Sequence, residues 1–138
     1  MARTASRPQL PGKLKHPREY RAVFAQGARV GSGSFRIYVH RNVLESARLG
    51  LGIAKHQVPT AVARNRLKRL IRESFRAVAV TFEGYDVVVV ARRPASVLTN
   101  REVRDQLGRG WEKVSAFARS SMGVKKLIGS PTSMRAEQ

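Results

Sequence analysis

The densest group of chemically active side chains lies in residues 64–76, where six basic residues accompany a single acid. At about 100° per residue, five of the basic side chains share one face of a helix. These five are Arg64, Lys68, Arg69, Arg72 and Arg76. Guanidinium and ammonium groups arranged along one face bind the phosphates of a polyanion. The segment therefore predicts an anion-binding helix.

A solvated surface is the alternative explanation, because any amphipathic surface helix has a charged face. Solvated faces usually combine Glu with Lys at i, i+4, since like charges at that spacing repel by a few tenths of a kcal/mol per pair. Here the cations follow one another at successive steps of four, so the sign of the charges favours an anionic partner. Leu67, Leu70 and Ile71 occupy the opposite, apolar side. Arg66 sits at the border, where its guanidinium can turn to either side.

The whole chain has the same bias. Its 138 residues fit one domain, and 42% hydrophobic and 26% charged residues are ordinary for a soluble globular protein. However, 27 Lys and Arg stand against nine Asp and Glu, for a net charge of +18, and 20 of the 27 are Arg. Such a protein repels itself unless a polyanion neutralises it, and nucleic acid is the commonest candidate.

Several other function classes are excluded or disfavoured. Cysteine is absent, so disulfides and thiolate metal sites are excluded. The first twenty residues lack the apolar stretch of a secretory signal, and the longest apolar run, Val87–Ala91, is far shorter than the roughly 20 residues that cross a bilayer. We therefore expect a cytoplasmic protein with no membrane partner. No obligatory protein partner is evident.

Nothing in the sequence indicates that the protein itself is a catalyst. Protein nucleases usually need clustered carboxylates for metal ions, or histidines as acid and base. The nine acids are scattered, and His16, His40 and His56 lack metal-ligand spacing. The segment Gly31-Ser32-Gly33 lacks the Lys and the following helix of a phosphate-binding loop. We predict no catalytic residue and no metal site in the protein.

Hydrophobic periodicity and turn residues indicate the elements that position these side chains. They predict a small mixed sheet of about four strands packed with three helices, an α+β or α/β two-layer sandwich in the order α-β-β-β-α-β-α. The expected segments are a flexible basic arm over 1–15, a domain over 16–119 and a disordered basic tail over 120–138. Within the domain we expect strands at 35–39, 49–54 and 85–92. The first expected helix runs from Pro17 and stops at Gly27, and the second is capped by Thr60 and runs to about Val80. The third starts at the capping box Thr99–Glu102 and runs to about Arg119.

One predicted strand has two chemically different faces. Phe35, Ile37 and Val39 alternate with Arg36, Tyr38 and His40. The first three side chains predict a core face, and the others a basic and aromatic face turned to solvent or RNA. For Tyr20 and Phe24 of the first helix, burial preferences alone favour a place in the core. Aromatic rings stack on the bases of a single strand without demanding a sequence.

The segment Arg64-Asn65-Arg66-Leu67-Lys68-Arg69-Leu70-Ile71-Arg72-Glu73 resembles the signature helix of the bacterial ribonuclease P protein subunit. The resemblance covers roughly residues 13–119 in order and spacing. It includes Arg18 to Gly27 for the first helix of the family, Phe35 to Tyr38 for a strand, Arg48 to Lys55 for the strand before the signature, and Tyr85 to Ala95 for the last strand.

The resemblance implies a fold with a left-handed β-α-β crossover, against the usual hand. It implies a protein that binds a catalytic RNA and assists removal of the 5′ leader from precursor tRNA, while the RNA does the chemistry with Mg²⁺ that the RNA and substrate hold. The residues that would contact the catalytic RNA are Arg64, Asn65, Arg66, Lys68, Arg69 and Arg72. The residues that would line a cleft for the leader are Tyr20, Phe24, Arg36, Tyr38 and Lys55, with His40 nearby.

Two positions depart from the family pattern. His56 stands where a second lysine is common, so a phosphate contact there would be weaker or dependent on pH. Tyr20 stands where phenylalanine is common, a change that preserves stacking. A ribosomal or other structural RNA-binding protein is the alternative function. It explains the charge equally well, but it predicts neither the basic and aromatic strand face nor the ordered match.

Overall fold

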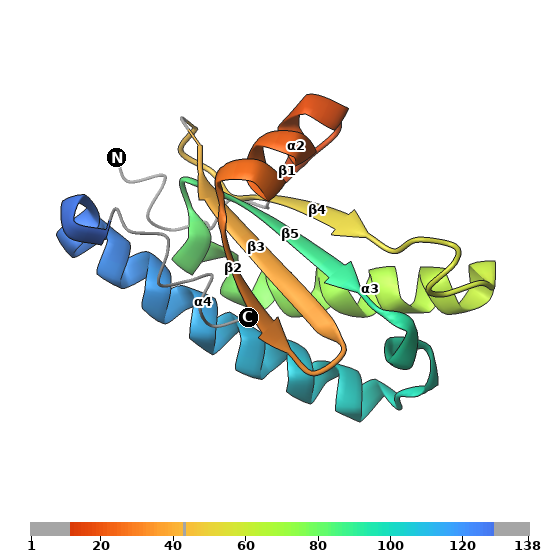
Figure 1. The fold of residues 1–138 in the computed structure, drawn as a ribbon. Helices are drawn as coiled ribbons and strands as arrows, with labels where there is room; N and C mark the ends of the chain where they lie inside the picture. Colours follow the sequence, from red (N-terminus) through yellow and green to blue (C-terminus); the bar gives the residue numbers. More distant parts are fainter. Residues whose placement is uncertain (1–11, 43, 129–138) are drawn as a thin grey trace, which may run out of the picture.

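The computed structural model describes residues 12–42 and 44–128 (Figure 1). The elements, in chain order, are β1 (Gly12–Lys13), α2 (Pro17–Gln26), β2 (Ala28–Ser32), β3 (Phe35–Arg41), β4 (Arg48–Gly52), α3 (Ala61–Val78), the short 3₁₀ helix η1 (Ala79–Phe82), β5 (Tyr85–Ala91), the short 3₁₀ helix η2 (Arg93–Val97) and α4 (Asn100–Ile128). From α2 onward, the helices and strands follow the predicted order α-β-β-β-α-β-α. The mixed α+β fold with three helices is thus confirmed.

The strands form one mixed sheet in the order β1-β4-β5-β3-β2. β4 is parallel to both β1 and β5, whereas β3 is antiparallel to β5 and β2. The sheet has five strands instead of about four, because β1 was not foreseen. In Figure 1, β4 and β5 point to the right with β4 above, and α3 connects them behind the sheet, so this β-α-β crossover is left-handed.

Alternating side chains give the sheet two different faces. Phe35, Ile37, Val87 and Val89 belong to the main core, together with the apolar sides of α3 and α4. The opposite face carries the short helix α2 and a smaller cluster built on Leu14, Val23 and Val88, with Tyr20, Tyr38 and Val90 packed against it. The basic and aromatic side of β3 therefore lies on the face of the sheet that carries α2.

The helix starts follow the chemistry expected from the sequence. Pro17 occupies the first turn of α2, and the Thr60 hydroxyl accepts a hydrogen bond from the Ala63 amide at 3.2 Å at the start of α3. Thr99 and Glu102 form the reciprocal capping box, at 2.8 and 3.1 Å. α2 ends before Gly27, where an added Cβ would lie 2.6 Å from the Val23 carbonyl oxygen.

The prediction of a flexible arm over residues 1–15 is wrong for its last residues. The Gly12 amide donates to the Ala47 carbonyl at 2.8 Å, the Leu14 amide donates to the Leu49 carbonyl at 3.1 Å, and Leu14 is buried. A two-residue strand is too short to show an alternating pattern, so periodicity could not reveal it. Residues 1–11 lie outside the described residues.

The tail predicted over 120–138 also begins too early, because α4 continues to Ile128. The glycine and serines of this segment favour disorder, but one Gly within a helix costs only about 1 kcal/mol relative to Ala. The end of α3 differs by less: the α-helix ends at Val78, and η1 continues to Phe82. Residues 129–138 lie outside the described residues.

Candidate nucleic-acid interface

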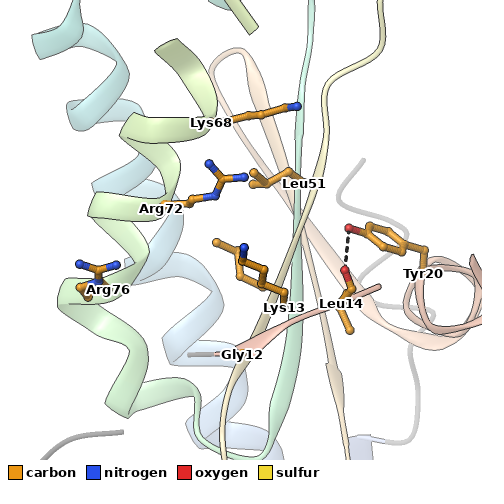
Figure 2. A pocket seen from close by; sticks show the side chains of 9 residues that line it. Gly12, Lys13, Leu14, Tyr20, Leu51, Lys68, Arg72 and Arg76 are labelled. Carbon is orange, nitrogen blue, oxygen red and sulfur yellow. Dashed lines mark hydrogen bonds between the residues drawn. The ribbon is translucent and has the colours of Figure 1, made fainter. Parts of the chain in front are cut away.

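The basic side of α3 meets the β1 edge of the sheet at a pocket of about 320 Å³ (Figure 2). Lys68 and Arg72 reach from α3 toward the strands, and Lys13 reaches from β1 toward α3. We call this site the cationic pocket; its lining residues are Gly12, Lys13, Leu14, Tyr20, Leu49, Leu51, Lys68, Arg72 and Arg76. Four of these nine residues are cationic and none is acidic. The arrangement suits a phosphate group beside an apolar surface.

The six predicted contact residues of α3 do not share one environment. Lys68 and Arg72 line the cationic pocket, and Asn65 and Arg69 are exposed. The Arg69 guanidinium lies 3.8 Å from the Glu73 carboxylate, and both side chains are more than half exposed. An ion pair of this kind contributes little to stability, so Arg69 can exchange Glu73 for another anion.

Arg64 and Arg66 form hydrogen bonds within the protein. Nη1 of Arg64 donates to the carbonyl oxygens of Val58 and Pro59, at 3.0 and 2.8 Å, and so ties the preceding loop to the first turn of α3. Nε of Arg66 donates to Oδ1 of Asn100 at 2.8 Å, and its Nη2 donates to the Leu98 carbonyl. The border position of Arg66 is thus used to connect α3 with the start of α4.

The predicted aromatic residues come together between α2 and β3. The rings of Tyr20 and Phe24 lie 6.5 Å apart, and those of Phe24 and Tyr38 lie 4.8 Å apart in an edge-to-face arrangement. Phe24 is 43% exposed, so it is not a core residue, and Tyr20 and Tyr38 are half-buried. This aromatic cluster, Tyr20, Phe24 and Tyr38, presents ring surface on which a base can stack.

The sequence interpretation missed Arg29, which adds a cation to the aromatic cluster. Its guanidinium carbon lies 6.0 Å from the centroid of the Tyr38 ring, within cation–π range. Arg29 stands directly opposite Tyr38 in the pairing of β2 with β3. The predicted order includes a strand before 35–39 but assigns no residues to it, because Gly31-Ser32-Gly33 indicates a turn or a strand break. The cross-strand neighbour of Tyr38 could therefore not be inferred.

Of the other predicted cleft residues, Arg36 lies on this face of the sheet, and Lys55 lies in a turn. Arg36 and its cross-strand partner Val90 are half-buried, two positions from Tyr38 along β3. His40, on the same face of β3, is also half-buried. Lys55 is exposed in the turn that follows β4. The neighbouring His56 carbonyl accepts a hydrogen bond from Arg93 at 3.4 Å, so this turn lies beside the chain that leaves β5.

Arg48 joins two acids that the sequence had left scattered. Its Nε and Nη2 donate to the two carboxylate oxygens of Asp86, each at 2.8 Å, and its Nη1 donates to Glu19 at 3.1 Å. Asp86 is buried and also accepts a hydrogen bond from Asn42 at 2.8 Å. In residues 12–42 and 44–128, no three His, Cys, Asp or Glu side chains are grouped as a metal ion would require.

Hydrogen bonds from the Lys15 and His16 amides, followed by the charge of Arg48, lower the pKa of Glu19 from 4.5 to about 2. A carboxylate with a depressed pKa stabilises the fold above its unfolded pKa, and this contribution is lost as the pH falls through the folded value. We therefore expect the stability difference between wild type and Glu19→Gln to be constant above about pH 5 and to shrink toward pH 2. Urea unfolding across this range measures it, and a difference that grew on acidification would contradict the assignment.

Comparisons with known proteins agree with this architecture. The family model for ribonuclease P matches residues 11–115. The chain is 39% identical over 107 residues to the ribonuclease P protein component of Aliivibrio fischeri, which covers 78% of this chain and 92% of that protein. It is 43% identical over 104 residues to the ribonuclease P protein component of Azotobacter vinelandii, and this match covers 75% of this chain and 80% of that protein.

Solved structures give the same result. The structure of the Staphylococcus aureus RNase P protein matches with a TM-score of 0.69 and 27% identity, over 74% of this chain and 94% of that one. The RNase P protein from Thermotoga maritima matches with a TM-score of 0.62 and 27% identity, over 70% of this chain and 92% of that one. Within residues 12–42 and 44–128, no helix has the length and apolar character to span a membrane. The sequence match, the fold and the basic helix together show that this chain belongs to the bacterial ribonuclease P protein family, the protein component of a tRNA-processing endoribonuclease.

Proposed function

We propose that the protein binds the catalytic RNA of ribonuclease P through α3 and the cationic pocket, and binds the 5′ leader of precursor tRNA through the aromatic cluster. The observation that carries this proposal is the presence of two kinds of surface, which adjoin at Tyr20. One consists of cations with an apolar floor at the β1 edge, and the other consists of aromatic rings flanked by Arg29 and Arg36. Two RNA segments can therefore be bound at once.

The cationic surface suits a structured RNA. Lys13, Lys68, Arg72 and Arg76 come from two elements that are far apart in sequence, and they converge on one pocket. Each contact with a phosphate releases a counterion, which makes such binding strong at low salt and steeply dependent on ionic strength. A folded RNA presents several phosphates at fixed positions, so it can use the convergent cations together.

The aromatic cluster suits a single strand. Base stacking on an aromatic side chain contributes about 1–3 kcal/mol per base without selecting a sequence, which fits a site that must accept many different leaders. Arg29 and Arg36 lie on the same face of the sheet and can contact the leader phosphates. Lys55 would contact the RNA leader where the leader passes the end of β4.

We assign the chemical step to the RNA subunit, with Mg²⁺ ions held by that RNA and by the substrate. Of the acids in this chain, Glu19 and Asp86 are brought together, but both are bonded to Arg48. The protein would contribute substrate affinity and would neutralise phosphates, which lets the two RNAs approach each other. This work would take place in the cytoplasm.

The deciding experiment is single-turnover cleavage of a 5′-labelled precursor tRNA by the cognate catalytic RNA at low Mg²⁺, with and without the protein. We expect a large increase in the cleavage rate when the protein is present. If the protein gave no increase at any salt or Mg²⁺ concentration, the structural RNA-binding alternative would replace this proposal.

Replacing Tyr38 by Ala is expected to weaken binding of precursor tRNA by roughly 5–150-fold, the equivalent of losing about 1–3 kcal/mol of stacking. Binding of mature tRNA, which has no leader, should change little. Tyr38→Phe keeps the ring and is the matched control, so it should bind precursor nearly as wild type does. Equal losses for precursor and mature tRNA would show that Tyr38 does not contact the leader.

A further inference from the structure

We infer that Arg48 is a positioning residue for leader binding: acting through Glu19, it sets the place of α2 on the sheet and hence the geometry of the aromatic cluster. The inference rests on the proposed function and adds to it two residues that are themselves outside the aromatic cluster. Neither Arg48 nor Glu19 needs to contact RNA for this role.

Few apolar contacts hold α2 to the sheet. Of its ten residues only Val23 is buried, and the apolar cluster beneath the helix is built on three buried side chains, Leu14, Val23 and Val88. Apolar contacts are non-directional, so this small cluster alone defines the register of the helix less sharply than hydrogen bonds do. Directional polar contacts therefore contribute to where α2 lies.

Arg48 supplies such a contact. Two of its nitrogens bind the buried Asp86 carboxylate side by side, each at 2.8 Å, which fixes the plane of the guanidinium relative to β5. The third nitrogen then points in a defined direction, and it meets Glu19 of α2 at 3.1 Å. Glu19 is itself oriented by the Lys15 and His16 amides, at 2.9 and 3.1 Å. These hydrogen bonds thus hold the first turn of α2 in a defined place relative to the sheet.

The next residue of α2 makes a second contact with the same strand. Tyr20 lies over Gly50, where an added Cβ would be 2.8 Å from Cε2 of the ring. Arg48 and Gly50 are alternate residues of β4 and so share one face, which means that Glu19 and Tyr20 together set the register of α2 along β4. Phe24, one helical turn after Tyr20, then meets Tyr38. A shift of Glu19 would therefore displace the rings of the aromatic cluster.

A direct contact between Arg48 and RNA phosphate is the competing explanation, and it predicts the opposite result for one substitution. Glu19→Gln removes a negative charge and releases Arg48, so a direct contact or general electrostatics would leave RNA binding equal or tighter. The positioning role predicts weaker binding of the leader. Gln can still accept the hydrogen bonds of the Lys15 and His16 amides, so the start of α2 is preserved.

The experiment uses the holoenzyme reconstituted with the catalytic RNA, and measures the ratio of its affinities for precursor and mature tRNA. We expect Glu19→Gln and Arg48→Lys each to lower this ratio about threefold, the scale of a partly exposed ion pair, because Lys cannot contact both carboxylates in the same way. The double variant should lose little more than either single variant. Glu73→Gln, the same change of charge on α3 beside Arg69, is the matched control and should leave the ratio unchanged.

The outcomes separate this inference from the proposed function. If wild type prefers precursor and neither variant alters the preference, the positioning role is wrong and leader binding stands. If Glu19→Gln tightens the binding of both tRNAs and leaves the ratio of their affinities unchanged, Arg48 acts only through charge, and the inference is also wrong. If wild type shows no preference for precursor, the leader proposal fails and this inference fails with it. Should Arg48→Lys not fold, Glu19→Gln decides alone.

Discussion

Changing Lys68, Arg72 and Arg76 together to Ala is expected to lower the affinity for the catalytic RNA by on the order of a hundredfold at moderate salt. All three side chains line the cationic pocket, and none has a hydrogen bond or ion pair with another residue in the described part of the chain. The slope of log K against log salt should become less steep by about 2–3, because up to three fewer counterions are released. Filter binding across a salt series measures both quantities.

The matched control removes the same amount of charge from another surface. Arg101, Arg104 and Arg109 are exposed on α4, and their replacement by Ala also lowers the net charge by three. If α3 provides the binding surface, this control should lose far less affinity than the α3 variant. Similar losses in the two variants would mean that the RNA responds to total charge, and the interface would then not be localised on α3.

Replacing Arg66 by Ala is expected to lower the free energy of unfolding by about 2 kcal/mol, since hydrogen bonds to a charged group contribute roughly 1.5–3 kcal/mol. The guanidinium connects α3 to Leu98 and Asn100, and its removal leaves both partners without it at the start of α4. Thermal unfolding should show a decrease in Tm of several degrees. This loss of folding stability is expected whether or not RNA is present.

Arg69→Ala provides the comparison, because Arg69 is more than half exposed and only its weak contact with Glu73 is lost. Its stability should change by less than about 0.5 kcal/mol. Thus two arginines three residues apart in one basic helix should behave in opposite ways, one in unfolding and the other in RNA binding. Unchanged stability in Arg66→Ala, together with a large loss of RNA affinity, would place Arg66 in the interface instead.

Much of the fold was predictable because its signals are local. The capping box at Thr99, the cap at Thr60 and the alternation in Phe35–Val39 each depend on residues within a few positions, and all three are present in the structure. β1 was not foreseen, because a two-residue strand has no period. β2 was included in the predicted order but not located, because Gly31-Ser32-Gly33 at its end indicates a turn or a strand break. Pairing with a neighbouring strand, which the sequence does not reveal, stabilises both.

The sequence predicted many of the residues of the candidate site, but not which way each side chain turns. Helical geometry placed Lys68 and Arg72 on the basic side of α3, and the structure brings them to one pocket. The same geometry left Arg66 at a border, and only the position of α4 decides which way it turns. Strand pairing adds Lys13 to the cationic pocket and Arg29 to the aromatic cluster. Arg48 contacts Glu19 and Asp86, which lie 29 and 38 residues away in the chain. Long-range contacts of this kind carry no local signal.

The short strand β1 has a consequence for how molecules of this protein meet one another. Without it, β4 would end the sheet, and its unpaired amide and carbonyl groups would be a template for a strand from a second molecule. β1 occupies those groups near Ala47 and Leu49, and it places the charged side chain of Lys13 at the rim. Two residues thus cover the first part of the β4 edge against pairing with a second molecule. A change that detaches them is expected to promote aggregation as well as to weaken RNA binding.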